Sequence, residues 1–401
     1  MDFQISEDSA PSEFISEEQR RQLVGRPPAS GAFLAGDPVG GRRFTKPFDI
    51  SLESGEVLTG ARLAYESWGE LNAARSNAVL VLHALTGDSH TTGPSGDGHP
   101  TAGWWNGLIG PGLAIDTDRY FVITPNVLGG CQGSTGPSSL NSSGREYGSK
   151  FPQLTIRDQA RAFNFLAAEL EIEQWNCLIG GSMAGMHALE MVIENPVVTK
   201  KLAILAAPPF STADQIALNT VQLEAIRSDS NFAGGDYYDS KPGFGPHKGL
   251  ALARRMALLN YRSPAELNER FGRSWQSKVS PLTQNGKYAV ESYLDFHGNK
   301  FVRRFDANSY ITLVSAMNSH DVGRDRESVE KALSRINCPT LVLGVDSDRL
   351  FPVSGQEIIA NNISGELFGG GLQVISSEFG HDGFLIELDA VGSRLRGLLD
   401  L

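Results

Sequence analysis

The stretch Cys177–Met191 carries the clearest indication of chemistry in this sequence. A short apolar run leads into Gly180, Gly181 and Ser182, and small residues and a helical pattern follow. This order predicts a strand, a very tight turn and a helix, with the serine at the apex of the turn. Such a turn presents the serine hydroxyl at the top of a sheet and beside a helix N-terminus, where free N–H groups favour negative charge. Ser182 is therefore either a nucleophile or only the N-cap of the helix.

A nucleophilic serine needs a base and an acid that orients the base, and two later strands lead into such residues. An apolar run at Thr340–Val345 precedes Asp346 and Asp348, and a second run at Gln373–Ser376 precedes His381. Sites in open α/β sheets collect beyond the carboxyl ends of the strands, so these side chains are expected at one sheet edge. The chain order Ser, Asp, His is that of α/β hydrolases, in which the histidine takes the serine proton and the aspartate orients it.

The identity of the acid is open between Asp346 and Asp348, which point to the same side if the strand continues. We favour Asp348, because an orienting carboxylate should lie in the loop beyond the last hydrogen bond of the strand. Sequence places strand ends only within ~2–4 residues, so the choice depends on that boundary. The alternative for Asp348 is a turn former ahead of Pro352, and the alternative for His381 is a surface loop residue.

Two backbone N–H groups are needed to stabilise the oxyanion that forms when a serine attacks an acyl carbon. Met183, directly after the serine, should supply one of them. The loop His83–Gly87, which follows an apolar run, should supply the other from Leu85. We interpret His83 itself as a core residue at the end of a strand.

The elements around these residues predict a doubly wound α/β sheet with an insertion. Buried strands are expected at 78–84, 120–124 and 202–205, a helix at 156–170, an antiparallel edge hairpin within 43–65 and a last helix at 384–398. Between about Pro208 and Arg326 the alternation stops, and helical patterns occur at 213–226, 249–259, 264–271 and 289–299. Helices inserted into an α/β chain are typical of a cap over a site.

The composition excludes several classes of protein. The 401 residues are 40% apolar and 20% charged, with a net charge of -11, so no basic stripe is available for nucleic acid. Cys131, Cys177 and Cys338 are few and widely spaced, which predicts buried reduced thiols, no disulfide framework and no metal site. The polar, acidic segment 1–26 is no signal peptide and no apolar run is long enough to cross a membrane, so we expect a cytoplasmic protein without membrane or nucleic-acid partners.

Several motifs in a fixed order resemble the homoserine O-acetyltransferase family of the α/β-hydrolase superfamily, over nearly the whole chain after about residue 43. One position departs from the family pattern, since Ala184 stands where the family usually has glycine. The motifs are His83-Ala84-Leu85-Thr86-Gly87, Gly103-Trp104-Trp105, Gly129–Pro137, Gly180-Gly181-Ser182-Met183, Asn318-Ser319-His320-Asp321, Asp348-Arg349-Leu350-Phe351-Pro352 and Gly380-His381-Asp382.

The resemblance implies a ping-pong acyl transfer that begins methionine biosynthesis. Ser182 would take an acetyl group from acetyl-CoA, a co-substrate rather than a bound cofactor, and His381 would activate the hydroxyl of L-homoserine. Arg254 would pair with the homoserine carboxylate, Asp382 would accept from its ammonium group, and Tyr261 would add a hydrogen bond. Arg255 leaves the choice of arginine open, although neighbouring positions on a helix face different ways and only one should reach the pocket.

The pattern of strands and helices predicts a core domain over residues 41–208 and 327–401, which the resemblance identifies as an α/β-hydrolase core, and a helical lid over 209–326. The Ser, Glu, Gly and Pro content of residues 1–40 predicts a loosely ordered arm. The resemblance also implies a homodimer formed through the lid. Relatives with the same frame acylate serine or use succinyl-CoA, and an esterase acting on small esters would also retain the triad. An amino-acid clamp made by Arg254 and Asp382 favours the transferase, because an esterase needs none.

Overall fold

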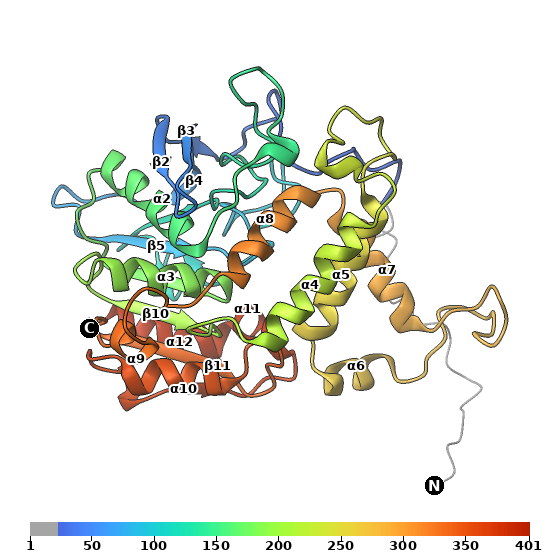
Figure 1. Cartoon of the computed structure of the whole chain (residues 1–401). Helices are drawn as coiled ribbons and strands as arrows, with labels where there is room; N and C mark the ends of the chain where they lie inside the picture. The colour runs from blue at the N-terminus through green and yellow to red at the C-terminus, as the bar shows by residue number, and fades with distance from the viewer. Residues whose placement is uncertain (1–22) are drawn as a thin grey trace, which may run out of the picture.

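An eight-stranded, mostly parallel sheet runs through the computed structural model, which describes residues 23–401 (Figure 1). The strand order is β1-β4-β8-β5-β9-β10-β11-β12; β1 and β4 form an antiparallel edge, and the pairings from β8 to β12 are parallel. This confirms the predicted α/β class. The strands are β1 (Arg43–Phe44), β4 (Ala64–Trp68), β5 (Ala78–Leu82), β8 (Phe121–Pro125), β9 (Cys177–Gly181), β10 (Leu202–Leu205), β11 (Thr340–Val345) and β12 (Gln373–Ile375).

The central strands are buried on both faces, which is why they read as continuous apolar runs. Along β5, Leu80 belongs to the core that lies against α2 (Ile156–Glu169) and α3 (Met183–Glu194). Its neighbour Val81 belongs to a separate core that includes residues of α12 (Leu388–Leu399). Figure 1 shows α3 and α12 on opposite sides of the sheet. Helices on both faces hold the strand ends, and therefore the loops that follow them, in fixed positions.

The N-terminal hairpin differs in detail from the prediction. β2 (Phe48–Ser51) and β3 (Val57–Ala61) form a two-stranded sheet of their own. The extended pattern is then interrupted at residues 62–63, and the next strand, β4, belongs to the main sheet. A short parallel pair, β6 (Ile109–Gly110) and β7 (Ile115–Asp116), lies elsewhere in the chain.

A set of helices separates β10 from β11, as the sequence predicted for the lid. In Figure 1 the helices α4, α5 and α7 lie side by side to the right of the sheet. The helix α8 was not predicted, because its Ile311, Thr312 and Val314 lower its intrinsic helix propensity. Asp306 caps it by accepting from the Ser309 N–H at 2.9 Å. The helices are α4 (Ala213–Arg227), α5 (His247–Tyr261), α6 (Pro264–Phe271), α7 (Ala289–Phe301), α8 (Ala307–Asn318) and α9 (Val329–Leu333).

The C-terminal part also differs from the prediction. The expected last helix is interrupted at Glu387, which has φ −79° and ψ 63°, and this residue separates α11 (Gly383–Ile386) from α12. The helix α10 (Val353–Asn362) was not predicted. Short 3₁₀ turns occur at Gly148–Lys150, Ala233–Gly235, Phe368–Gly370 and Gly380–Asp382.

The described part of the predicted arm is not loose. Ser30 donates to Asp306 at 2.7 Å, and the Gly31 N–H donates to the Phe305 carbonyl at 3.2 Å. An added Cβ at Gly31 would lie 2.5 Å from the Arg304 nitrogen, so the backbones touch. The first 22 residues of that arm lie outside the described residues. Within residues 23–401, no helix has both the length and the apolar character to cross a membrane.

Candidate active site

Ser182 lies in the turn between β9 and α3, with φ 59° and ψ −129°. This is a strained conformation for a residue with a side chain. The turn is tight because β9 and α3 are in direct contact: an added Cβ at Gly180 would lie 2.3 Å from the Ala184 carbonyl oxygen, and one at Gly185 would lie 3.2 Å from the Gly180 carbonyl oxygen. Ala184, the departure from the family pattern, is fully buried in this arrangement. The elbow therefore forms with a methyl group at that position.

His381 lies between Ser182 and Asp348. The three residues follow the ends of three different strands, β12, β9 and β11 respectively. Its Nε2 is 2.8 Å from the Ser182 Oγ, and its Nδ1 is 2.6 Å from the Asp348 Oδ2. Because a carboxylate only accepts, Nδ1 carries the proton and Nε2 accepts from the serine hydroxyl. The other Asp348 oxygen accepts from the N–H groups of Leu350 and Phe351 at 2.8 and 2.9 Å, which fixes the carboxylate.

Asp346, the other candidate acid, does not reach the histidine. It is exposed, and its carboxylate accepts from the Ser377 N–H at 3.1 Å. The geometry therefore places Asp348, and not Asp346, beside the base.

The surroundings of His381 favour its charged form. Burial alone would lower its pKa, but the charge and the hydrogen bond of Asp348, together with the charge of Asp382, outweigh burial and raise the pKa above the ordinary value. Burial also raises the pKa of Asp382, against the lowering effect of Arg262, His381 and Arg254. The site thus stabilises an imidazolium of the kind that forms when a serine proton is taken up.

Of the two expected oxyanion donors, Met183 directly follows the serine and Leu85 lines the same cavity as the serine. Met183 is the first residue of α3, and Leu85 lies in the loop after β5. Within residues 23–401, neither backbone N–H donates to a protein acceptor. His83 orders the loop, because its Nδ1 donates to the Ala84 carbonyl at 2.8 Å and its Nε2 accepts from the Val127 N–H at 2.9 Å. Burial lowers the pKa of His83, in keeping with a neutral ring that donates once and accepts once.

A cavity of about 260 Å³ opens over the serine between the core and the lid. On the lid side, Arg254 lies over the rings of Tyr261 and Phe301, at 5.5 and 5.1 Å from their centroids. Its Nη1 is buried and has no hydrogen-bond partner among the described residues. Arg255 turns away and pairs with Asp295 at 2.8 Å. The cavity is lined by Ala84, Leu85, Thr86, Ser182, Arg254, Tyr261, Arg262, His381, Asp382, Phe384, Leu385 and Ile386.

Comparison with known proteins places this geometry in a family. A family model described as the alpha/beta hydrolase fold matches residues 77–388. A homoserine O-acetyltransferase from Leifsonia xyli subsp. xyli is 62% identical over 399 residues, which cover 99% of each chain. The chain belongs to the homoserine O-acetyltransferase family. Its fold is the α/β-hydrolase fold.

Solved structures of this family and of esterases share the frame. The homoserine O-acetyltransferase from Bacillus anthracis has a TM-score of 0.80 at 26% identity, and the match covers 90% of this chain and 97% of that one. Esterase E22 has a TM-score of 0.79 at 25% identity, with 89% and 99% covered. Similar backbones therefore occur in members of the homoserine O-acetyltransferase family and in a hydrolase, and side chains must separate the two activities.

Two residues of the site were not identified from the sequence. Arg262 pairs with Asp382, with 3.3 Å between its Nε and the carboxylate Oδ2, so the predicted ammonium acceptor already has one cationic neighbour. Ser347 joins the loops of the acid and the base, since its hydroxyl donates to the Ser377 carbonyl and accepts from the Gly380 N–H. Each lies next to a residue that the sequence analysis did single out, but its partner lies far along the chain, and sequence spacing gives no sign of such a contact.

A group of three possible metal ligands lies outside the site and was also missed. One donor atom from each of Glu66, His90 and His99 falls within 4.8 Å of the others. These atoms have protein partners: the His90 Nδ1 is 3.0 Å from Glu66, and the His99 Nε2 accepts from the Gly41 N–H at 3.2 Å. This hydrogen bonding satisfies the cluster without an ion. The three cysteines are free and buried, as predicted, and burial raises the pKa of Cys131 to about 12.

Proposed function

We propose that this chain transfers the acetyl group of acetyl-CoA to the side-chain hydroxyl of L-homoserine through an acetyl-serine intermediate, the first committed step of methionine biosynthesis. The observation that carries the proposal is the guanidinium of Arg254: its side chain lines the same cavity as Ser182, and its buried Nη1 has no hydrogen-bond partner within residues 23–401. A guanidinium with a free donor beside a nucleophile is suited to the carboxylate of an amino acid, which it can bind through two N–H groups. The names of the relatives give the same acceptor.

In the first half-reaction, the Ser182 Oγ attacks the thioester carbon while the His381 Nε2 takes its proton. The carbonyl oxygen becomes an oxyanion between the N–H groups of Leu85 and Met183. The tetrahedral intermediate collapses, the carbon–sulfur bond breaks, and the proton on His381 passes to the departing sulfur. Asp348 stabilises the imidazolium between these two proton transfers.

In the second half-reaction, the homoserine hydroxyl replaces CoA in the cavity. His381 takes the proton of this hydroxyl, whose oxygen attacks the acetyl carbon, and the same two N–H groups bind the new oxyanion. The bond to the Ser182 Oγ then breaks, and the serine recovers its proton from His381. Transfer to homoserine in preference to water requires the acceptor to be held in place, because water is present at far higher concentration.

The α-carboxylate and the α-ammonium group of homoserine are each bound by a charged side chain. Arg254 binds the α-carboxylate, Asp382 accepts from the α-ammonium, and Tyr261 adds a hydrogen bond from beside Arg254. Arg262, which pairs with Asp382, keeps that carboxylate from bearing a buried charge alone before the substrate arrives.

Hydrolysis of a small ester is the second candidate, because esterase E22 shares the frame at a TM-score of 0.79. An esterase has no use for a guanidinium that lines the serine's cavity and keeps an Nη1 without a partner in the described part of the chain. Serine as acceptor and succinyl-CoA as donor are further alternatives on the same frame, and they call for a direct assay.

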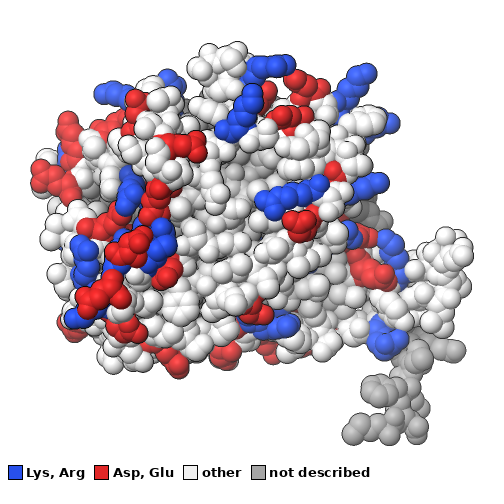
Figure 2. All heavy atoms as spheres, in the orientation of Figure 1, with Lys and Arg blue, Asp and Glu red and all other residues white. Residues whose placement is uncertain are grey.

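We further propose that the chain works in the cytoplasm as a homodimer formed through the lid. An uncharged area covers the centre of the face shown in Figure 2, while charged side chains gather at its edges. The outer surfaces of α4 and α5 expose Ile216, Val221, Leu252 and Leu259. Exposed apolar side chains on adjacent helices are typical of a surface that another chain covers.

A donor-by-acceptor assay tests the proposal. The protein is mixed with acetyl-CoA or succinyl-CoA, each with homoserine, serine or no acceptor, and the free thiol is measured. We expect rapid thiol release only with acetyl-CoA and homoserine together. Thiol release from acetyl-CoA that homoserine does not accelerate would support the hydrolase, and release with another pair would reassign the substrates.

A further inference from the structure

The turn that follows β5 presents the Leu85 N–H, which the proposed mechanism assigns to the oxyanion. Residues 84–87 form this turn, which we call the oxyanion turn, and the Gly87 N–H closes it by donating to the Ala84 carbonyl at 2.9 Å. The Ala84 carbonyl belongs to the same peptide group as the Leu85 N–H, and it also accepts from the His83 Nδ1 at 2.8 Å. The direction of the Leu85 N–H therefore depends on how the oxyanion turn is held.

Arg304 contacts the oxyanion turn from outside the active site. It follows α7, and its Nη2 donates to the Thr86 carbonyl while its Nη1 lies 3.4 Å from the Asp88 carboxylate. The side chain is 21% exposed, and a hydrogen bond from a charged donor is stronger than one between neutral groups. Arg304 is not one of the described residues that line the larger cavity over the serine. Its effect on the reaction must therefore pass through the turn.

We propose that Arg304 is a positioning residue for the oxyanion site, which holds the Thr86 carbonyl and thereby keeps the Leu85 N–H directed at the reacting carbonyl. The inference rests on the proposed acyl-serine mechanism. Backbone rotation within so short a turn moves the Thr86 carbonyl and the Leu85 N–H together, so fixing the first restricts the second. An oxyanion donor acts over only about 2.7–3.1 Å, and a small displacement of the N–H weakens it.

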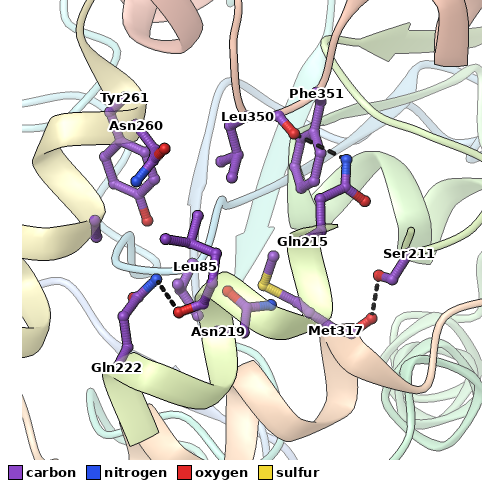
Figure 3. A pocket seen from close by; sticks show the side chains of 12 residues that line it. Leu85, Ser211, Gln215, Asn219, Gln222, Asn260, Tyr261, Met317, Leu350 and Phe351 are labelled. Carbon is purple, nitrogen blue, oxygen red and sulfur yellow. Dashed lines mark hydrogen bonds between the residues drawn. The ribbon is translucent and has the colours of Figure 1, made fainter. Parts of the chain in front are cut away.

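The side chain of Leu85 holds the oxyanion turn in a different way. It is buried, and it borders a small cavity of about 10 Å³ together with Asn219 and Gln222 of α4 and Tyr261 of α5. Figure 3 shows Leu85 among these side chains of the lid. Apolar packing has no preferred direction, so it fixes the place of Leu85 without aiming its N–H. A hydrogen bond is directional, and the one from Arg304 supplies the orientation that packing does not.

The backbone that carries Arg304 is itself fixed by two distant segments. Gln132, in the loop after β8, donates through its Nε2 to the Arg304 carbonyl at 2.7 Å. On the other side the chain passes so close that an added Cβ at Gly31 would lie 2.5 Å from the Arg304 nitrogen. A side chain can hold another group accurately only when it is itself held in place.

The neighbouring arginine makes a contact of the same kind with another part of the chain. Arg303 donates to the carbonyls of Leu23 and Gly25 at 2.8 and 2.6 Å, so it holds the N-terminal segment and not the oxyanion turn. Arg303→Met is therefore a matched control for Arg304→Met, because each variant loses one positive charge and its hydrogen bonds to backbone carbonyls.

The test measures acylation of the serine directly in the full-length protein, with p-nitrophenyl acetate. The burst of nitrophenol reports acylation whatever the acceptor is. Arg304→Met should slow the burst about 30-fold, which is less than the ~10²- to 10³-fold cost of deleting an oxyanion donor outright. Arg304→Lys keeps the charge and a donor, so its burst should be only about threefold slower than that of the wild type. Arg303→Met should leave the burst within about twofold.

Two inhibitors separate positioning of the oxyanion turn from a general loss of structure. Trifluoroacetone adds to a reactive serine and forms a tetrahedral oxyanion like that of the reaction, so its inhibition constant should rise in Arg304→Met by about the factor by which the burst falls. L-2-Aminobutyrate has the amino-acid part of homoserine and no oxygen that becomes an oxyanion. Its inhibition constant, and the KM for homoserine, should change by no more than about twofold.

An unchanged burst in folded Arg304→Met would overturn the inference, as would an unchanged inhibition constant for trifluoroacetone or an equal weakening of both inhibitors. A melting curve shows whether the variant has folded. If Arg304→Met does not fold, Arg304→Lys decides: its burst rate and its affinity for trifluoroacetone should fall together, and equality with the wild type in both would overturn the inference. Failure of the proposed function gives a different result, because the ester burst still depends on Arg304 while acetyl-CoA and homoserine release no thiol with the wild type.

Discussion

The two sides of the larger cavity differ in how far their polar groups are already paired. On the core side, His381 has hydrogen bonds at both ring nitrogens, and Asp348 accepts from the histidine and from two backbone N–H groups. On the lid side, the Arg254 Nη1 has no partner among the described residues. The core thus holds its catalytic geometry before any substrate binds, whereas the lid presents a donor that an incoming carboxylate can satisfy. Mutations on the two sides should accordingly change different kinetic parameters.

The largest effect is expected for the nucleophile. Ser182→Ala should lower kcat for thiol release by about 10⁵-fold or more, because the residues of a triad act as a unit and the covalent route is lost. Steady-state assays with acetyl-CoA and homoserine measure this loss, and mass spectrometry should find no acetylated protein. Ser393→Ala, at an exposed position of α12, serves as the control. Full activity in the Ser182→Ala variant would rule out the mechanism for both candidate reactions.

The next effect concerns the acid on the core side. Asp348→Asn should lower kcat/KM by about 10³- to 10⁴-fold, because an amide in this place no longer fixes the histidine tautomer. Asp346→Asn, the matched control, should remain within about twofold. Equal losses in the two variants would contradict the assignment of Asp348.

The pH dependence of kcat/KM in the wild type and in the Asp348→Asn variant tests the assignment of Asp348 further. His381 must be neutral to act as a base. The ordinary pKa of histidine is about 6.5, and the pKa of His381 is raised above it, so the acid limb of wild-type kcat/KM should lie at a higher pH than that ordinary value. Activity should therefore fall as the pH drops through that raised value. Loss of the Asp348 charge removes the main stabilisation of the imidazolium, so the limb of Asp348→Asn should move to lower pH. A limb that does not move would show that another group titrates.

The lid side is expected to affect the acceptor alone. Arg254→Ala should raise KM for homoserine by about 100-fold, since a buried carboxylate loses a charged partner. The acylation burst with p-nitrophenyl acetate should change little. Arg255→Ala, whose arginine pairs with Asp295, is the control for the loss of a positive charge from the same helix. If Arg254→Ala slowed acylation as much as transfer, the division between the two sides would be wrong.

More of the core than of the lid could be predicted from the sequence, for physical reasons. Strands buried on both faces leave a plain pattern, so β5, β9, β10 and β11 were found nearly to the residue, and with them the strand ends that carry the triad. The lid depends on contacts between distant segments. The helix α8 was missed because its packing and its Asp306 cap overcome a weak propensity. The pairing of Arg262 with Asp382 joins residues that no local pattern relates.

The smallest effect is expected at Ala184, which lies on the core side beside the nucleophile. Ala184→Gly restores the usual family residue but removes a fully buried methyl group and adds backbone freedom within α3. We expect a loss of about 1–2 kcal/mol in the free energy of unfolding, measured by denaturant titration. Activity should stay within about twofold, because hydrogen bonds on both sides of Ser182 fix the elbow: its N–H donates to the Leu205 carbonyl at 2.9 Å, and its carbonyl accepts from the Gly185 N–H at 2.9 Å. A tenfold gain in activity would instead mean that the methyl holds the serine away from its best position, and that the core side is not fully preorganised.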